Sequence, residues 1–266
     1  MRITYVGHAT LLLEIGGRRF LTDPNFEGAL GGFLPRVSAP GVLIEQLPAL
    51  DALILTHAHA DHLSFTSLDQ LPRTIPLFAP PAVAAWLLRR GYAHVEALPP
   101  GGAARVGDVV ISAAAARHEG SRYGVDRWRS AANMYLFDAG TASEGAGSCF
   151  FAGDTGLTPT SHRPVAERLE GTGRTLDIAL LPIGHAPWWK FTFRSGHLTS
   201  DDAVTLFERL GARYMIPYHW GTFDHVTSGA HDAVTRLRTR MGSYERREQV
   251  RIIEPGETFV VPAMDG

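Results

Sequence analysis

Cysteine is almost absent from this sequence of 266 residues, which contains only Cys149. A single cysteine cannot form an intrachain disulfide. It also cannot supply the several thiolates that many structural zinc sites use. Zinc sites built on thiolates are therefore excluded, and a metal in this protein would need nitrogen and oxygen ligands.

The sequence also lacks an excess of either charge and any long apolar run. With 25 Lys plus Arg against 27 Asp plus Glu, the formal net charge is -2, so no general attraction to nucleic acid or an anionic membrane is expected. No apolar stretch approaches the roughly 18–20 residues that span a bilayer. The N-terminus has no basic segment followed by an apolar stretch of about 7–15 residues, as a signal peptide would. We expect a cytoplasmic protein that has no transmembrane segment and does not bind nucleic acid.

Short apolar segments separated by turn residues run along the whole chain. Strands are predicted for residues 2–6, 10–15, 18–23, 51–56, 94–98, 108–115, 132–138, 148–153, 177–183, 213–219, 251–255 and 258–262. Helices are predicted for residues 80–91, 199–211 and 230–241. Residues 24–48 are rich in Gly and Pro and indicate a long surface loop. Because no repeat or low-complexity linker interrupts this pattern, we expect residues 1–266 to form one mixed α/β domain.

The sequence THAHADH, residues 56–62, concentrates four side chains that can bind metals: His57, His59, Asp61 and His62. The strand before it ends near Thr56, and two histidines two positions apart in an extended chain point the same way. A turn into a helix would bring Asp61 and His62 back to the same space. Imidazole with a neighbouring carboxylate suits zinc, manganese or iron(II). Because a catalytic zinc usually takes three protein ligands, four in one motif suggest two metals.

Three further residues of the same chemistry stand where predicted strands end. They are His118, Asp154 in FFAGDTG and His219 in YMIPYH. Catalytic groups are common at such positions in layered α/β folds. Taken singly, either histidine could be structural and Asp154 could form an Asx-turn. It is the joint pattern of seven residues that indicates a metal site.

This pattern resembles the metallo-β-lactamase superfamily, whose HxHxDH motif and three distant partners match here in order and spacing along nearly the whole chain. The segments YVGHATLLLE, FLTDP, FFAGDTG, LPIG and HWGTF resemble one branch in particular. That branch contains N-acylphosphatidylethanolamine-hydrolysing phospholipase D and ascorbate-6-phosphate lactonase-like proteins, and the phospholipase is the more similar. The resemblance implies a four-layer αβ/βα sandwich, with two mixed β-sheets flanked by helices and a dinuclear site at one edge.

The resemblance also implies which residue binds which ion. His57, His59 and His118 would hold one metal, Asp61, His62 and His219 the other, and Asp154 would bridge both. Asp23, in FLTDP, corresponds to an aspartate that supports the site by orienting a ligating histidine. His8, in GHAT, is also shared with the family, without an indicated role. The cofactors would be two divalent ions, with Zn favoured and Mn or Fe as alternatives.

Two ions about 3.5–4 Å apart can activate a bridging water and stabilise an oxyanion, which makes Asp61 and Asp154 catalytic as well as ligating. His197, in SGHLTSDDA, has a family counterpart beside the metals and is the candidate proton donor to the leaving group. The alternative is that His197 caps or packs beneath the helix that follows it.

Substrate contacts are expected from the segment after the strand 177–183. The candidates are His185, Trp188, Trp189, Lys190 and Arg194. The aromatic residues could form an apolar wall and the basic ones could meet a phosphate, although the tryptophans could equally lie in the core. Arg122, Arg127 and Arg129, shortly after His118, could carry substrate anions or could belong to a solvated loop.

The favoured function is a metal-dependent hydrolase acting on a phosphodiester in a small-molecule or lipid-like substrate, as phospholipase D does. A lactonase or carboxylic-ester hydrolase would use the same metals. A non-catalytic metal-binding protein would be marked by lost ligands, and none is lost. The membrane phospholipase has an extra N-terminal region that is not matched here. A soluble substrate is therefore an alternative to a membrane lipid. Homo-oligomers are common in this fold, and one is conceivable here.

Overall fold

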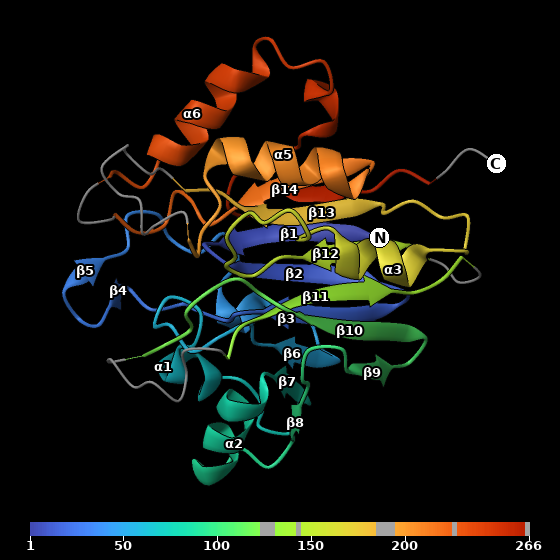
Figure 1. The fold of residues 1–266 in the computed structure, drawn as a ribbon. Helices are drawn as coiled ribbons and strands as arrows, with labels where there is room; N and C mark the ends of the chain where they lie inside the picture. The colour runs from blue at the N-terminus through green and yellow to red at the C-terminus, as the bar shows by residue number, and fades with distance from the viewer. Residues whose placement is uncertain (123–130, 142–144, 185–194, 225–227, 264–266) are drawn as a thin grey trace.

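Two mixed β-sheets pack face to face, with helices on their outer sides (Figure 1). The computed structural model describes residues 1–122, 131–141, 145–184, 195–224 and 228–263. Together the sheets and helices form the four layers that the sequence predicts.

The first sheet contains mainly N-terminal strands. Their order is β15 (Thr258–Val260), β1 (Arg2–Gly7), β2 (Thr10–Ile15), β3 (Arg18–Thr22), β6 (Ala52–Ile54), β7 (Leu77–Ala79) and β8 (Val95–Ala97). Neighbours are antiparallel from β15 to β3 and parallel from β3 to β8. Helices α1 (Phe65–Leu68) and α2 (Pro81–Arg89) cover its outer face.

The second sheet contains the later strands. Their order is β14 (Tyr214–Tyr218), β13 (Ile178–Pro182), β12 (Ser148–Phe151), β11 (Asn133–Asp138), β10 (Val109–Ala115) and β9 (Ala103–Val106). Strands β12, β13 and β14 are parallel to one another, and the remaining pairs are antiparallel. Helices α3 (Arg163–Leu169), α5 (Ser200–Leu210) and α6 (Asp232–Met241) lie over this sheet.

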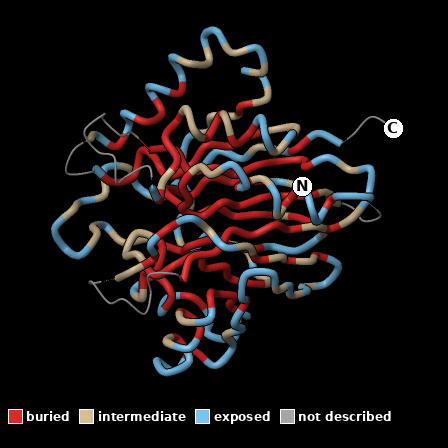
Figure 2. Tube along the Cα trace, viewed as in Figure 1, coloured by how far each residue is buried: buried red, intermediate tan, exposed pale blue. Residues whose placement is uncertain are grey.

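Side chains of the first sheet alternate between two apolar cores, as the period of a strand requires. Leu12, Leu21 and Leu53 pack in the core beneath α1 and α2. The residues on either side of them point into the core between the sheets, where the Phe20 and Phe137 rings lie 5.2 Å apart. Figure 2 shows the buried chain following the strands of both sheets. The strands are therefore fixed on both faces, and their ends form a rigid rim.

Most predicted elements are confirmed to within two residues at each end, but the strand predicted at 251–255 is wrong. Val250, just before that segment, makes a single bridge to Met215 at the edge of β14, and Arg251 N donates to Met215 O at 2.7 Å. Pro255 cannot donate to a ladder, which helps to end the pairing there. The predicted loop 24–48 contains a short hairpin, β4 (Ala29–Leu30) and β5 (Leu34–Pro35), and a 3₁₀ turn, η1 (Ile44–Gln46). A second such turn, η3 (Arg247–Gln249), precedes the bridge.

No helix in the described part of the chain is both long enough and apolar enough to cross a membrane.

Candidate metal centre

The seven predicted ligands lie together at one edge of the sandwich, although they come from both sheets. The segment that follows β6 in the first sheet carries His57, His59, Asp61 and His62. The second sheet supplies the rest, His118 after β10, Asp154 after β12 and His219 directly after β14. Their ligand atoms form overlapping groups in which all atoms lie within 4.8 Å of one another.

The first group contains three imidazoles. His59 Nδ1 lies 3.0 Å from both His57 Nε2 and His118 Nε2. The outer nitrogens are held by the protein, because His118 Nδ1 donates to Gly196 O at 2.8 Å and His57 Nδ1 lies 2.9 Å from Thr56 Oγ1. Nitrogens that share a tetrahedral zinc are about 3.4 Å apart. The three nitrogens are therefore close enough together to be ligands of one ion.

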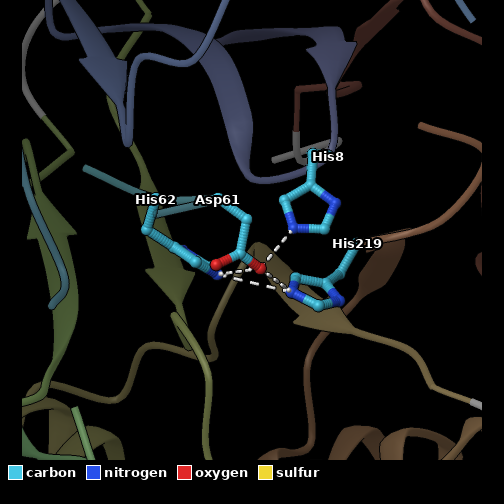
Figure 3. A group of neighbouring side chains, drawn as sticks. All are labelled: His8, Asp61, His62 and His219. Carbon is cyan, nitrogen blue, oxygen red and sulfur yellow. Dashed lines mark hydrogen bonds and ion pairs between the residues drawn. The ribbon is translucent and has the colours of Figure 1, made fainter. Parts of the chain in front are cut away.

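The second group contains Asp61, His62 and His219, and His8 lies within the same 4.8 Å range beside them (Figure 3). The two Nε2 atoms of His62 and His219 are 3.3 Å apart. Asp61 Oδ2 lies 3.6 Å from His62 Nε2 and 3.5 Å from His219 Nε2. These separations also match the edges of a tetrahedron around one ion.

Asp154 lies between the two groups. Its Oδ2 is 3.4 Å from His62 Nε2, and its Oδ1 is 3.4 Å from His219 Nε2. The same carboxylate also lies within ligand range of His57 and of His118. Its Oδ1 is buried and has no hydrogen-bond partner among the described residues. A buried carboxylate oxygen without a partner is costly, and a cation would remove that cost. The residues therefore fit a metal site, with Asp154 in reach of both groups.

Charge is divided unevenly over the site. Burial raises the pKa of Asp61 and Asp154, but the neighbouring imidazoles outweigh it and hold both pKa values well below the usual range. Burial would lower the pKa of His219, but Asp154 raises it to about 9. Burial lowers the pKa of His57 and His59, and that of His118 to about 3. The first group is thus neutral, which is the form in which imidazole binds metals.

Asp23 is buried and contacts both His62 and the residue that precedes the THAHADH histidines. Its Oδ2 lies 2.8 Å from His62 Nδ1, and it accepts hydrogen bonds from the Thr56 amide at 2.8 Å and the Thr56 hydroxyl at 2.6 Å. The imidazole is thereby held with Nε2 facing the other ligands. Thr56 was not predicted to take part, yet it connects Asp23 to His57.

Two side chains that sequence reasoning missed or misread hold the backbone of the THAHADH segment. Asn25 Nδ2 donates to Ala60 O at 3.1 Å and to Asp61 O at 3.2 Å. Arg122 Nη1 donates to Leu63 O at 2.6 Å and to Ala58 O at 3.3 Å. The guanidinium of Arg122 therefore stabilises the ligand segment, and neither of the two roles predicted for it describes this.

His197 lies beside Asp154, with its Nε2 3.4 Å from Asp154 Oδ2 and its ring 4.8 Å from that of His118. Its side chain is 29% exposed and lines a cleft of about 480 Å³. The cleft is lined by His59, Arg117, His118, Glu119, Ser195, Gly196 and His197. The alternative of a helix cap is wrong, because the cap of α5 is Thr199, which accepts from the Asp202 amide. His197 is thus accessible from the cleft and adjacent to the ligands.

The substrate contacts predicted from sequence are His185, Trp188, Trp189, Lys190 and Arg194, and all of them lie outside the described residues, as do Arg127 and Arg129. Among the described residues, Arg117, a basic residue not predicted as a substrate contact, lines the cleft, and its Nε donates to Ser195 O at 3.2 Å.

The backbone is strained at this edge. Among the described residues, the non-glycine positions with positive φ are His8 (55°), Asp23 (34°) and His219 (69°). Such conformations cost energy and persist where the surrounding structure enforces them, often at functional sites. All three belong to the metal centre or contact it.

Comparison with known proteins gives a family and several relatives. The family described as "Beta-lactamase superfamily domain" matches residues 18–220, which include all seven candidate ligands. N-acyl-phosphatidylethanolamine-hydrolyzing phospholipase D 1 of Caenorhabditis elegans is 28% identical over 244 residues, which are 85% of this chain but only 65% of the phospholipase. A UPF0173 metal-dependent hydrolase of Geobacillus is 28% identical over 259 residues, covering 97% of this chain and 98% of that protein. The solved structure of isothiocyanate hydrolase from Delia radicum gut bacteria matches with a TM-score of 0.76 at 22% identity, over 99% of this chain and all of that one, a likeness of fold.

Proposed function

Because the chain belongs to the β-lactamase superfamily domain family, we propose that it is a metal-dependent hydrolase that uses two divalent ions, zinc by preference, to cleave a phosphodiester. The observation that carries the proposal is the position of Asp154, whose carboxylate lies within ligand range of both histidine groups. Mn or Fe would suit the same nitrogen and oxygen ligands. The relation to a metal-dependent hydrolase over almost its whole length supports the reaction class.

When bound, two such ions would supply a nucleophile at neutral pH and neutralise the charge that develops on the substrate. The residues of the chain would do the rest. Asp154, His62 and His219 would keep the ions at a fixed separation. His197 Nε2 would carry a proton to the leaving group, because its side chain faces the cleft beside Asp154.

A phosphodiester is favoured as the substrate because of the similarity to the phospholipase and the presence of Arg117 in the cleft. A guanidinium can pair with two phosphate oxygens. The substrate would be a small molecule or lipid-like. The cytoplasmic location, the absence of nucleic-acid binding and a homo-oligomer all remain predictions.

The proposal is tested by counting metals and comparing substrates. The purified protein, reconstituted with zinc, should bind two equivalents per chain by elemental analysis. It should hydrolyse bis(p-nitrophenyl) phosphate faster than a p-nitrophenyl carboxylic ester or a simple lactone. Turnover of the lactone or the ester alone would select the lactonase or esterase alternative. One equivalent of metal, persisting after reconstitution, would contradict a dinuclear mechanism, and no turnover at full occupancy would favour a non-catalytic metal-binding protein.

Replacing His197 by glutamine should reduce hydrolysis while both zinc ions remain bound. Glutamine cannot transfer a proton at this position, so the rate should fall by about 10²–10⁴-fold for a diester with a poor leaving group. For a good leaving group, which needs no proton, the loss should be much smaller. The measurement is kcat for two diesters of different leaving-group pKa, with metal content as the control. Equal losses for both diesters would exclude His197 as the proton donor.

A further inference from the structure

His8 contacts the metal centre without being one of its seven predicted ligands. It lies in the turn between β1 and β2 of the first sheet, where the residue is 2% exposed. Its φ of 55° is unusual for a residue with a side chain. Nothing in the reaction proposed above uses it, so its burial and strain call for a separate reason.

The side chain of His8 holds Asp61. His8 Nε2 lies 2.9 Å from Asp61 Oδ2, the same oxygen that faces His62 and His219 (Figure 3). As a metal ligand, Asp61 is a carboxylate and can only accept, so the 2.9 Å contact places the hydrogen on His8 Nε2. His8 therefore donates to the oxygen that an ion in the second group would share.

The backbone and ring of His8 hold His219. The His219 amide donates to His8 O at 2.9 Å, and the two imidazole rings are 3.9 Å apart. On the other side of His8, the ring of Phe223 lies at 5.3 Å, edge to face. Because His8 belongs to the first sheet and His219 ends a strand of the second, this contact ties the two halves of the sandwich at the metal centre.

We propose that His8 is a positioning residue that fixes Asp61 and His219 as ligands of one ion. The inference rests on the proposed two-metal site and adds a residue to it. His8 is not itself a further ligand, because a ligating nitrogen needs a lone pair and Nε2 carries the hydrogen given to Asp61. Hydrogen bonds of this kind orient ligating groups, and their loss typically weakens metal binding by about 10–100-fold.

Metal titration of the His8 variants tests this directly. Zinc binding is measured by competition with a chromophoric chelator in the wild type, His8→Ala, His8→Gln and, as a control for losing a histidine, His231→Ala. His231 is exposed and outside the metal centre. In His8→Ala the second equivalent should bind about 10–100-fold more weakly, while the first is unchanged. In His8→Gln, whose amide nitrogen can donate from a similar distance, most of that affinity should return.

The two His8 variants share the strain of a positive φ, so the difference between them reports the hydrogen bond. Circular dichroism of the metal-free proteins checks that both fold. With Co²⁺ as the probe, His8→Ala should change the visible absorption of the second ion only. Two zinc ions bound normally by His8→Ala, equal weakening of both ions, or identical behaviour of the two variants would each overturn the role of His8. If the wild type bound only one zinc, the two-metal site itself would be wrong. That outcome is therefore distinguishable from a failure of the His8 role alone.

Discussion

Replacing Asp154 by alanine is expected to remove hydrolysis and to lower the metal content of the purified protein. One carboxylate reaches both histidine groups, so in the proposed two-metal site both ions would lose a ligand in the same variant. The loss of activity should exceed the about 10–100-fold that is typical of residues that only support a ligand. The measurements are kcat/KM for a phosphodiester and zinc per chain after reconstitution.

Asp138→Ala is a suitable control for Asp154→Ala. Asp138 ends β11 on the second sheet, pairs with Arg174 at 2.8 Å, and belongs to none of the candidate ligand groups. Its loss should leave zinc content and activity near the wild-type values. Full activity in Asp154→Ala would refute the bridging role, and a similar loss in both variants would point to general instability.

Replacing Gly153 by alanine is expected to destabilise the protein and to weaken metal binding together. Gly153 has a φ of 55°, and an added Cβ would lie 2.7 Å from Thr56 Cγ2 and 3.0 Å from Asn133 O. The left-handed backbone costs about 1–2 kcal/mol for a residue with a side chain. Overpacking adds roughly 1–3 kcal/mol. Because Thr56 holds Asp23 and contacts His57, its displacement should also disturb the ligands.

Gly171→Ala separates the two causes. Gly171 has a φ of 74°, but an added Cβ there would meet nothing within 4 Å. Thermal unfolding of both variants, with and without zinc, should show a larger loss of Tm for Gly153→Ala, and weaker zinc binding in that variant alone. Equal Tm losses would mean that only the backbone conformation matters and that the contact with Thr56 is tolerated.

Much of the fold is readable from the sequence because each strand carries its own signal. Apolar runs bounded by Gly and Pro predict the strands of both sheets, and the Pro start and Gly stop predict α2. Most elements that were not predicted are short, such as β7 with three residues and α1 with four, but α3, with seven, was also missed. In such segments the periodicity has no room to appear. Their conformation depends on packing against distant parts of the chain.

The candidate ligands were predictable for a different reason, since their chemistry is rare and densely spaced. The residues that hold these ligands in place were less predictable from the sequence. Asn25 and Arg122 are ordinary loop residues, and only the folded chain reveals that they donate to backbone oxygens of the ligand segment. The cap of α5 could have been recognised, because Thr199 and Asp202 form a capping box three residues apart. That signal would have removed capping as a role for His197, though not packing beneath the helix.

The origin of the ligands in both sheets makes the metal centre a cross-link. His62 and His219 are 157 positions apart in the chain. An ion bound to both would join these two positions, as a disulfide joins two cysteines. Because the ion would bind the folded chain and leave on unfolding, its contribution to stability would rise with the logarithm of the free ion concentration. A chain with one buried cysteine would thus obtain from metal the covalent-like restraint that it cannot obtain from sulfur, and its resistance to unfolding would follow the metal supply.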